Sequence, residues 1–289
     1  MTEATTYVGR RSTRLAGNFG LYAGFAVAVA LSLFPIVAVL MLSMKQRHEV
    51  FAWPPAFLPE AFNLSTYVYV LTQTPLSRML WNSFYLTAWT VVGCLLVSAP
   101  AAYAFSRMRF PGHRTILLIL LVYQMISSLV IAIPLYRYFE MLGLLDSHLG
   151  VILVYITVEI PFTVWLLKGF FDAIPVSLDE AARIDGASRL QVLRLVILPL
   201  AKPGLAAAMI FNVISAWSQF IVPFILLQRT ELLPISIGVL NFAPGQTEGE
   251  VTIPYLAAAS IMAMLPAIIM FIILQRFIVQ ALTGGAVKG

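Results

Sequence analysis

The chain has 289 residues, of which 60% are hydrophobic and only 11% charged, and its mean hydropathy is +0.90. Soluble domains are about half apolar and a quarter charged, so this composition excludes an ordinary soluble domain and indicates an integral membrane protein. The formal net charge of +5 is no sign of nucleic-acid binding, because the basic residues cluster at the ends of apolar runs.

Six uncharged or nearly uncharged stretches are long enough to cross a bilayer as helices, which takes about 20 residues. The first follows a basic N-terminus but is too long for a signal peptide, so we interpret it as a retained span. The sequence therefore predicts an all-α polytopic membrane protein with six transmembrane helices, at residues 19–44, 80–105, 115–136, 149–167, 203–228 and 251–275.

The distribution of lysine and arginine predicts the orientation of these spans. With the N-terminus inside, 13 of the 18 basic residues fall in cytoplasmic segments. The external segments hold only Lys45, Arg47, Arg78, Arg137 and Arg229. Because cytoplasmic loops are enriched in Lys and Arg, we expect both termini in the cytoplasm.

Prolines and one long loop punctuate the spans. The loop at residues 45–79 contains Trp53-Pro54-Pro55 and Pro59, which argue against a continuous helix, although a short helix is expected from Asn63 onwards. The single cysteine, Cys94, lies in an apolar run and is expected to be a small lipid-facing or helix-facing filler. Each span contains or borders a proline that can kink it, namely Pro35, Pro100, Pro134, Pro161, Pro223 and Pro266.

A polar segment between the fourth and fifth spans is the most informative part of the chain. It reads Glu180-Ala181-Ala182-Arg183-Ile184-Asp185-Gly186, then nine residues, then Val196-Ile197-Leu198-Pro199. Capping-box spacing at Ser177-Leu178-Asp179-Glu180 and at Ser188-Arg189-Leu190-Gln191 predicts two helix starts. Gly186 stands between them, where a helix end favours a residue that tolerates positive φ. The segment, at about residues 172–202, therefore predicts a cytoplasmic two-helix hairpin.

Two other interpretations of this hairpin are disfavoured. DNA-binding helix–turn–helix motifs also have a glycine in the turn. Here the hairpin is tethered between two spans, and its second helix is too apolar for a DNA groove. Double capping argues against an incidental solvated loop. The spacing instead resembles the EAA loop of permease subunits of ABC importers, E-A-A-x3-G-x9-I-x-L-P, with Val196 in place of isoleucine.

The resemblance covers essentially the whole chain and narrows to carbohydrate importers. Residues 161–171 resemble the run ahead of the loop in those permeases, and Asn82-Ser83 and residues 101–107 resemble the two ends of their second span. The tail at residues 280–289 is similar to that of the maltose-type permease with six spans. The resemblance implies a permease subunit in the inner membrane that moves a mono-, di- or oligosaccharide or a related polyol by alternating access.

The same resemblance implies partners and contact residues. The partners are a homologous second permease, a dimeric cytoplasmic ATPase and an extracytoplasmic sugar-binding protein. The tail residues Gly284, Gly285 and Lys288 would reach the ATPase dimer. The hairpin would dock the ATPase through Glu180, Ala181, Ala182, Asp185, Gly186, Leu198 and Pro199.

No enzymatic machinery is evident in the sequence. None of the four lysines follows glycine in the Gly-Lys-Ser/Thr context of a P-loop, so ATP and Mg²⁺ are expected on the partner ATPase and no cofactor on this chain. His48, His113 and His148 are dispersed in loops without a Cys/His cluster, which gives a metal site little support. We therefore expect a transport subunit, not an enzyme.

Polar residues at membrane depth are candidates for the substrate path, since they are costly there. Glu159 lies near the middle of the fourth span; it either faces the path or is a partnered structural glutamate. Asn212, Ser215 and Gln219 are spaced to share one helix face, with Trp217 nearby, and Gln124 lies in the third span. For each of these, hydrogen-bonded packing between helices is the alternative.

The expected division is a cytoplasmic N-terminal segment at residues 1–18, a six-span permease domain at 19–276 and a cytoplasmic tail at 277–289. One rival interpretation is an autonomous secondary transporter or channel with Glu159 as a proton site. Such proteins often have inverted repeats and more than six spans, and neither is evident here. A membrane-embedded enzyme is a weaker rival, because no acid/base or metal constellation is present.

Overall fold

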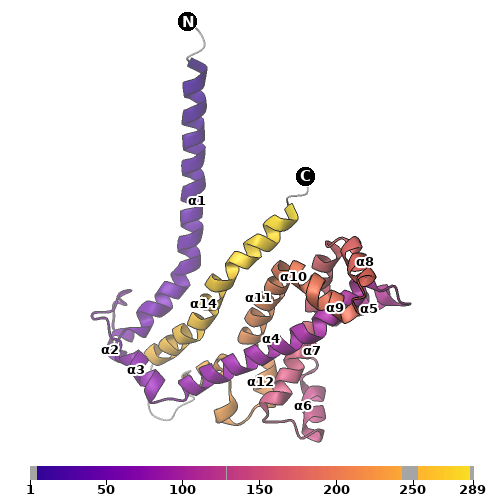
Figure 1. The fold of residues 1–289 in the computed structure, drawn as a ribbon. Coiled ribbons are helices and arrows are strands. Elements are labelled where there is room, and N and C mark those ends of the chain that lie inside the picture. The colour runs from indigo at the N-terminus through magenta and orange to yellow at the C-terminus, as the bar shows by residue number, and fades with distance from the viewer. Residues whose placement is uncertain (1–4, 128, 243–252, 287–289) are drawn as a thin grey trace. The chain divides into compact units, whose positions relative to one another are not determined.

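The computed structural model describes residues 5–127, 129–242 and 253–286, and these form helices without any strand (Figure 1). Two compact units share the chain. Unit 1 comprises Met1–Val70 and Phe242–Ile261, and unit 2 comprises Leu71–Asn241 and Met262–Gly289. The fold class expected from the sequence, an all-α membrane protein, is confirmed by long apolar helices in both units.

Unit 1 is built around the first apolar helix. It contains α1 (Thr5–Ser43), α2 (Arg47–Val50), most of α3 (Ser65–Thr72) and the start of α14 (Ile253–Ala286). The Ser43 and Tyr67 hydroxyls are 2.5 Å apart, and the rings of Tyr69 and Tyr255 stack with centroids 4.7 Å apart. These contacts tie the ends of α1 and α14 to α3, the short helix that the sequence predicts after Asn63.

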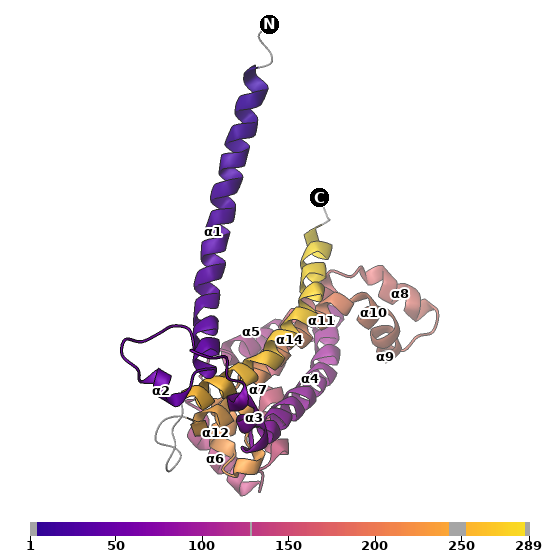
Figure 2. The same ribbon diagram turned by 90° about the vertical axis from the view of Figure 1, so that its left-hand side faces the viewer.

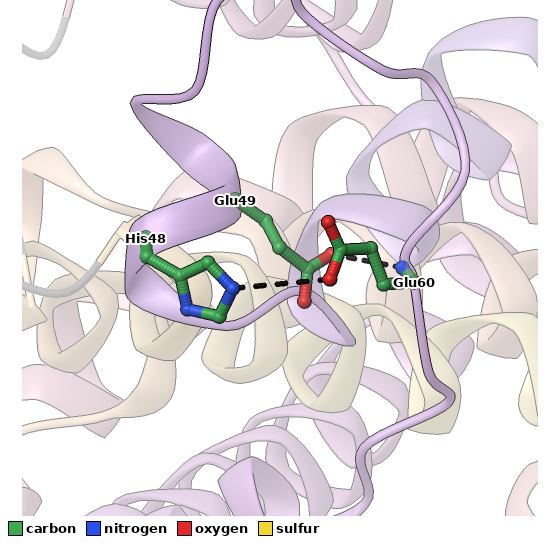
Figure 3. A group of neighbouring side chains, drawn as sticks. All are labelled: His48, Glu49 and Glu60. Carbon is green, nitrogen blue, oxygen red and sulfur yellow. Dashed lines mark hydrogen bonds and ion pairs between the residues drawn. The ribbon is translucent and has the colours of Figure 1, made fainter.

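The loop between α2 and α3 is closed by one glutamate (Figure 3). The buried Glu49 carboxylate accepts backbone N–H bonds from Gln46 at 3.1 Å and from Glu60 at 3.0 Å. The His48 Nε2 atom lies 3.9 Å from the Glu60 carboxylate, with both side chains mostly exposed. This group brings His48 to two carboxylates, which the sequence does not predict. Because both Glu49 oxygens already accept backbone bonds, its evident role is to close the loop.

Unit 2 is organised around three helices that lie side by side in both views, namely α4 (Leu76–Arg107), α7 (His148–Asp172) and α11 (Lys202–Ser218) (Figures 1 and 2). Polar side chains link all three. The Cys94 thiol donates to the Thr163 hydroxyl at 3.4 Å, and Thr163 donates to the Asn212 side-chain oxygen at 2.9 Å. Cys94 is fully buried and therefore faces helices, one of the two positions expected for it.

Small residues let these helices approach closely. A Cβ atom at Gly204 would lie 2.4 Å from the ring of Phe170, and the glycine itself is buried. Real Cβ atoms do not approach other atoms this closely, so only glycine fits without moving α7 or α11. Close contact through small residues is a common way for membrane helices to pack.

Four of the described helical segments are long and apolar enough to span a membrane, and a fifth arises if one bent pair counts as a single span. The expected span at 115–136 is not a continuous helix: α5 (His113–Tyr123) ends early, and α6 (Ala132–Met141) follows after a turn. Two local features favour the break. Ser127 accepts the N–H of Leu129 through its hydroxyl, and Pro134 stands in the first turn of α6, where a proline is best tolerated.

The expected span at 203–228 is also interrupted. Helix α11 ends at Ser218, Gln219 is extended with ψ at 122°, and α12 (Ile221–Leu226) follows. A continuous helix would bond the carbonyl of Gln219 to the N–H of residue 223, which is a proline and has none. The freed carbonyl instead accepts the hydroxyls of Ser236 at 2.9 Å and Tyr155 at 3.4 Å. Gln219 therefore does not continue the helix face of Asn212 and Ser215, and that prediction was wrong.

Candidate functional site

The polar segment between the fourth and fifth spans folds as a hairpin at one end of unit 2 (Figures 1 and 2). Helix α8 (Val176–Ile184) ends before Gly186, whose φ is +88°. Helix α9 (Arg189–Val192) then begins the returning arm. The predicted turn at Gly186 is therefore confirmed. A left-handed backbone conformation is costly for residues other than glycine, which explains why a glycine stands at this position.

The two predicted capping boxes had different outcomes. Ser188 and Gln191 form a complete box: the Gln191 side chain accepts the Ser188 N–H at 2.7 Å, and the Ser188 hydroxyl accepts the Gln191 N–H at 3.4 Å. The box predicted from Ser177 to Glu180 is wrong. Pro175 is the N-cap residue, two positions earlier, so Ser177 already lies inside the first turn of α8.

The returning arm bends sharply where it meets α11. After α9 the chain makes a π-helical turn at Leu193–Ile197, in which the Leu198 N–H bonds the Leu193 carbonyl. Helix α10 (Leu198–Leu200) contains Pro199, which has no N–H to continue the usual pattern. The segment Arg189–Leu200 and helix α11 meet at 83°, so Leu198 and Pro199 stand at the corner between the hairpin and the membrane helix.

The outer surface of the hairpin combines acidic and apolar side chains. Glu180, Ala181, Asp185 and Gly186 are exposed, and Ala182 is half-buried. Ile184 is 86% exposed. Four of the five predicted docking residues of the first arm are thus exposed, while Ala182 packs against buried apolar residues of unit 2.

The inner side of the hairpin is held by a buried ion pair that the sequence did not single out. Arg107, the last residue of α4, places its Nε atom 2.9 Å from the Asp179 carboxylate, and both side chains are less than a tenth exposed. Arg107 also donates to the Ile174 carbonyl at 2.8 Å, and the Tyr103 hydroxyl donates to Asp179 at 3.4 Å. Asp179 thus points inward to α4, while its neighbour Glu180 points outward.

Further contacts join the ends of α4 and α7 just before the hairpin. The Ser106 hydroxyl donates to Asp172 at 2.6 Å, and Lys168 pairs with the same carboxylate at 2.5 Å. Beneath the hairpin, Val192 and Ile197 pack with no exposed surface into an apolar cluster that includes Phe171 of α7. A displacement of the hairpin would therefore act on both membrane helices.

The polar residues at membrane depth make contacts within this chain. Glu159 is buried and accepts a hydrogen bond from the Ser215 hydroxyl, joining α7 to α11. Asn212 is fully buried; its oxygen accepts from Thr163, while its side-chain nitrogen has no partner among the described residues. The Trp217 ring nitrogen donates to the Ala263 carbonyl at 3.1 Å. These are interhelical packing bonds, and a role in the path stays a prediction.

The remaining predicted residues are more scattered. Gln124, just past the end of α5, is exposed and donates to the Val158 carbonyl at 3.0 Å. Gly284 and Gly285 lie in the last turns of α14, and Lys288 lies outside the described residues.

Comparison with known proteins defines the class of transport component to which this fold and hairpin belong. Residues 95–284 match the family model described as "Binding-protein-dependent transport system inner membrane component". This range contains the whole hairpin. The chain belongs to this family, so it is an inner-membrane transport component, and the expectation of a non-enzymatic subunit is confirmed.

Particular relatives extend over nearly the full chain. The trehalose transport system permease protein SugB of Mycobacterium tuberculosis is 34% identical over 97% of this chain and 99% of its own length. The maltose/maltodextrin transport system permease protein MalG of Escherichia coli K12 is also 34% identical, over 90% of this chain and 92% of MalG. A solved bacterial ABC transporter for the acidic polysaccharide alginate has a chain with a TM-score of 0.80 and 27% identity, covering 92% of this chain and 97% of that one.

These similarities confirm the resemblance to permeases of carbohydrate ABC importers. They give no support to the rival interpretation as an autonomous secondary transporter or channel.

Proposed function

We propose that this chain is one of two membrane subunits of an ATP-driven importer for a sugar or related polyol. It would work with a homologous second permease, a dimeric cytoplasmic ATPase that carries the ATP and Mg²⁺, and an extracytoplasmic binding protein. The sugar class is supported by relatives named for maltose, trehalose and alginate transport. Transport would proceed by alternating access of the membrane helices.

The observation that carries the proposal is the two-sided hairpin. Its outer side presents Glu180, Asp185 and the exposed Ile184 to a partner, while its inner side is fixed to α4 through Asp179 and Arg107. Because the outer side of the hairpin is exposed and its inner side is anchored to α4, a movement of a docked ATPase can be transmitted through the hairpin to the membrane helices. Coupling requires that the ATPase contact the hairpin differently in its two states.

The orientation follows from the same assignment. If the hairpin docks a cytoplasmic ATPase, the ends of α4 and α7 that carry it face the cytoplasm. The excess of lysine and arginine in the corresponding segments supports this side, and with it cytoplasmic N- and C-termini. The tail residues Gly284, Gly285 and Lys288 would then be on the same side as the ATPase and available to contact it.

The proposed path runs along the contact of α7 with α11. Glu159, Asn212 and Ser215 supply polar groups there, and Trp217 and Gln219 follow Ser215 in the sequence. Gln124 donates to the carbonyl of Val158, the residue before Glu159. The side-chain nitrogen of Asn212 is buried without a partner among the described residues, so it has donors available for a ligand. Reorientation of the two helices would be needed to expose these buried groups to a substrate.

Co-purification from the native membrane tests the docking role. We expect a P-loop ATPase and a second permease to co-purify with the tagged wild-type chain. Glu180→Lys reverses an exposed charge of the docking surface, and Gly186→Val strains a residue at φ +88°, so both should lose the ATPase and coupled uptake while still inserting in the membrane.

Gly169→Val is the matched control for the turn. A Cβ atom added at either Gly169 or Gly186 would have no other atom within 4 Å, but only Gly186 has positive φ. The control should therefore keep the ATPase. Normal ATPase capture and uptake by both Glu180→Lys and Gly186→Val would contradict the docking role.

A further inference from the structure

A cleft of about 490 Å³ lies beside the hairpin, where α4 ends and α5 begins. Its lining is strongly basic and includes Arg107, Arg109, His113, Arg114 and Lys168. None of the described residues that line it is acidic. A concave surface with this concentration of positive charge is suited to an anion.

Two of the four lysine and arginine side chains in this lining form ion pairs with other described residues, and two do not. Arg107 is paired with Asp179 and Lys168 with Asp172. Arg109 and Arg114 are exposed, and neither side chain forms an ion pair or hydrogen bond with another described residue. The nearest acids on the packed elements are therefore neutralised by other groups, which leaves the two arginines to act on a ligand.

The loop that carries Arg109 is held in place by aromatic contacts. The rings of Phe105 and Phe110 lie 5.4 Å apart, and those of Phe110 and His113 lie 5.9 Å apart. Gly112, at φ +82°, then starts α5 directly at His113. The N–H groups of a helix's first turn lack partners within the helix and favour an anion, so this end of α5 adds to the positive field of the cleft.

The position of the cleft identifies the kind of anion. It lies at the junction between the end of α4, a helix long and apolar enough to span the membrane, and the start of the apolar α5. The ends of spanning helices lie at the level of the lipid headgroups. Leu117, one turn into α5, adds an apolar side chain to the lining.

We infer that this cleft binds the phosphate of an anionic phospholipid headgroup, with Arg109 and Arg114 as the principal contacts. Arginine suits this role because its guanidinium group can donate two parallel hydrogen bonds to a phosphate. The bound lipid would fill the space between α4, α5 and the first turn of α8 at Val176, next to the anchored side of the hairpin. The inference does not depend on ATPase docking.

Lipid retention by the full-length protein tests the inference. The protein is purified in detergent with any subunits that stay bound, and lipids retained are counted by native mass spectrometry after exchange with phosphatidylglycerol or phosphatidylcholine. We expect selective retention of phosphatidylglycerol by the wild type. Arg109→Gln with Arg114→Gln should weaken it about tenfold or more, because each basic residue near a membrane surface contributes about fivefold to binding an anionic lipid.

Matched variants separate a site from general surface charge. Arg78→Gln with Arg229→Gln removes the same charge from two exposed arginines outside the cleft and should retain phosphatidylglycerol as the wild type does. Arg109→Lys with Arg114→Lys keeps the charge and should keep most of the binding even if the glutamine variant is poorly folded. Equal loss in the Arg78 and Arg229 variant, or no loss in the glutamine variant of the cleft, would overturn the inference.

Inorganic phosphate distinguishes a lipid from a free anion. In a thermal-unfolding assay, micelles containing phosphatidylglycerol should raise the midpoint of the wild type but not of the glutamine variant. Inorganic phosphate at the same phosphate concentration should have much less effect, because it lacks the acyl chains that hold the headgroup at this depth. Equal stabilisation by inorganic phosphate would contradict the lipid assignment.

Discussion

Two regions of unit 2 are held together by different interactions: the attachment of the hairpin to α4, and the contacts among helices α4, α7 and α11. At the hairpin end, a full ion pair between Arg107 and Asp179 joins α4 to α8. Along the helices, the contacts are hydroxyl and amide bonds, such as Thr163 to Asn212, together with the close approach at Gly204. The first kind tolerates little change in either partner, while the second is spread over many small contacts.

This difference fits the two proposed roles, which are coupling to the ATPase by the hairpin and rearrangement during transport by the membrane helices. A coupling element has to keep its geometry while its partner moves. The ion pair, with the additional hydrogen bonds to Ile174 and Tyr103, fixes both the distance and the orientation of α8 relative to α4. Helices that change their arrangement during transport need contacts that can be exchanged at small cost. Mutations in the two regions should therefore differ in the size of their effect.

The largest effect is expected at the buried ion pair. Asp179→Ala leaves the Arg107 guanidinium buried without a counter-charge, and breaking a buried pair in this way costs roughly 3–5 kcal/mol. We expect the hairpin to become sensitive to limited proteolysis and the thermal midpoint to fall.

The exposed pair of Arg229 and Glu231 supplies the control for that experiment. Both side chains are at least half exposed, so Glu231→Ala should cost no more than about 1 kcal/mol. If Asp179→Ala is as mild as Glu231→Ala, the ion pair does not anchor the hairpin.

A smaller effect on stability is expected between the membrane helices. Glu159→Gln keeps an oxygen that can accept from Ser215, so the free energy of unfolding should change by about 1 kcal/mol or less. If Glu159 belongs to the path, uptake should nevertheless slow, measured with the sugar that the co-purified binding protein carries. Unchanged uptake with unchanged pH dependence would remove Glu159 from the path.

The smallest effect is expected in unit 1, at the loop that Glu49 closes. The backbone N–H of Glu60 bonds the Glu49 carboxylate and, with the Gln46 N–H and nearby basic groups, holds the pKa of Glu49 below its ordinary value. A lowered pKa means that the bonded carboxylate stabilises the loop above the ordinary value of about 4.5, and that this is lost as the pH falls through the lowered pKa.

Trp53 reports on that loop, since its side chain is 90% exposed. Acidification should change its fluorescence in the wild type at a pH below 4.5, whereas Glu49→Gln should already have the acid-form signal at neutral pH. Identical pH profiles for the two proteins would show that Glu49 does not close the loop. The other tryptophans are replaced by phenylalanine in both proteins for this measurement.

The sequence predicted those parts of the structure that depend on neighbouring residues. The box at Ser188, the turn at Gly186 and the four uninterrupted apolar helices each follow from a local pattern. The break after Ser218 has only an ambiguous local signal: Pro223 leaves the Gln219 carbonyl without its helical donor, but Pro100, Pro161 and Pro266 do the same within helices that continue. The apolar run of residues 203–228 obscured this signal.

Contacts between residues far apart in the chain could not be predicted from the sequence. Arg107 and Asp179 are 72 positions apart, and neither carries a local sign that it faces the other. Helix α8 begins directly after Pro175, so Asp179 lies in its first turn and pairs with Arg107 of α4. Glu159 and Ser215 are likewise joined only by the packing of α7 on α11.

A photocrosslinking experiment tests the central claim, that the hairpin docks the ATPase, most directly. A photoreactive residue replaces Ile184 on α8 in one protein and Met141 on α6 in another; these side chains are 86% and 80% exposed. Figure 1 places α6 at the opposite end of unit 2 from α8. In native membranes, position 184 should capture a P-loop ATPase and position 141 should not. Capture of no ATPase at 184, or equal capture at both positions, would contradict the account.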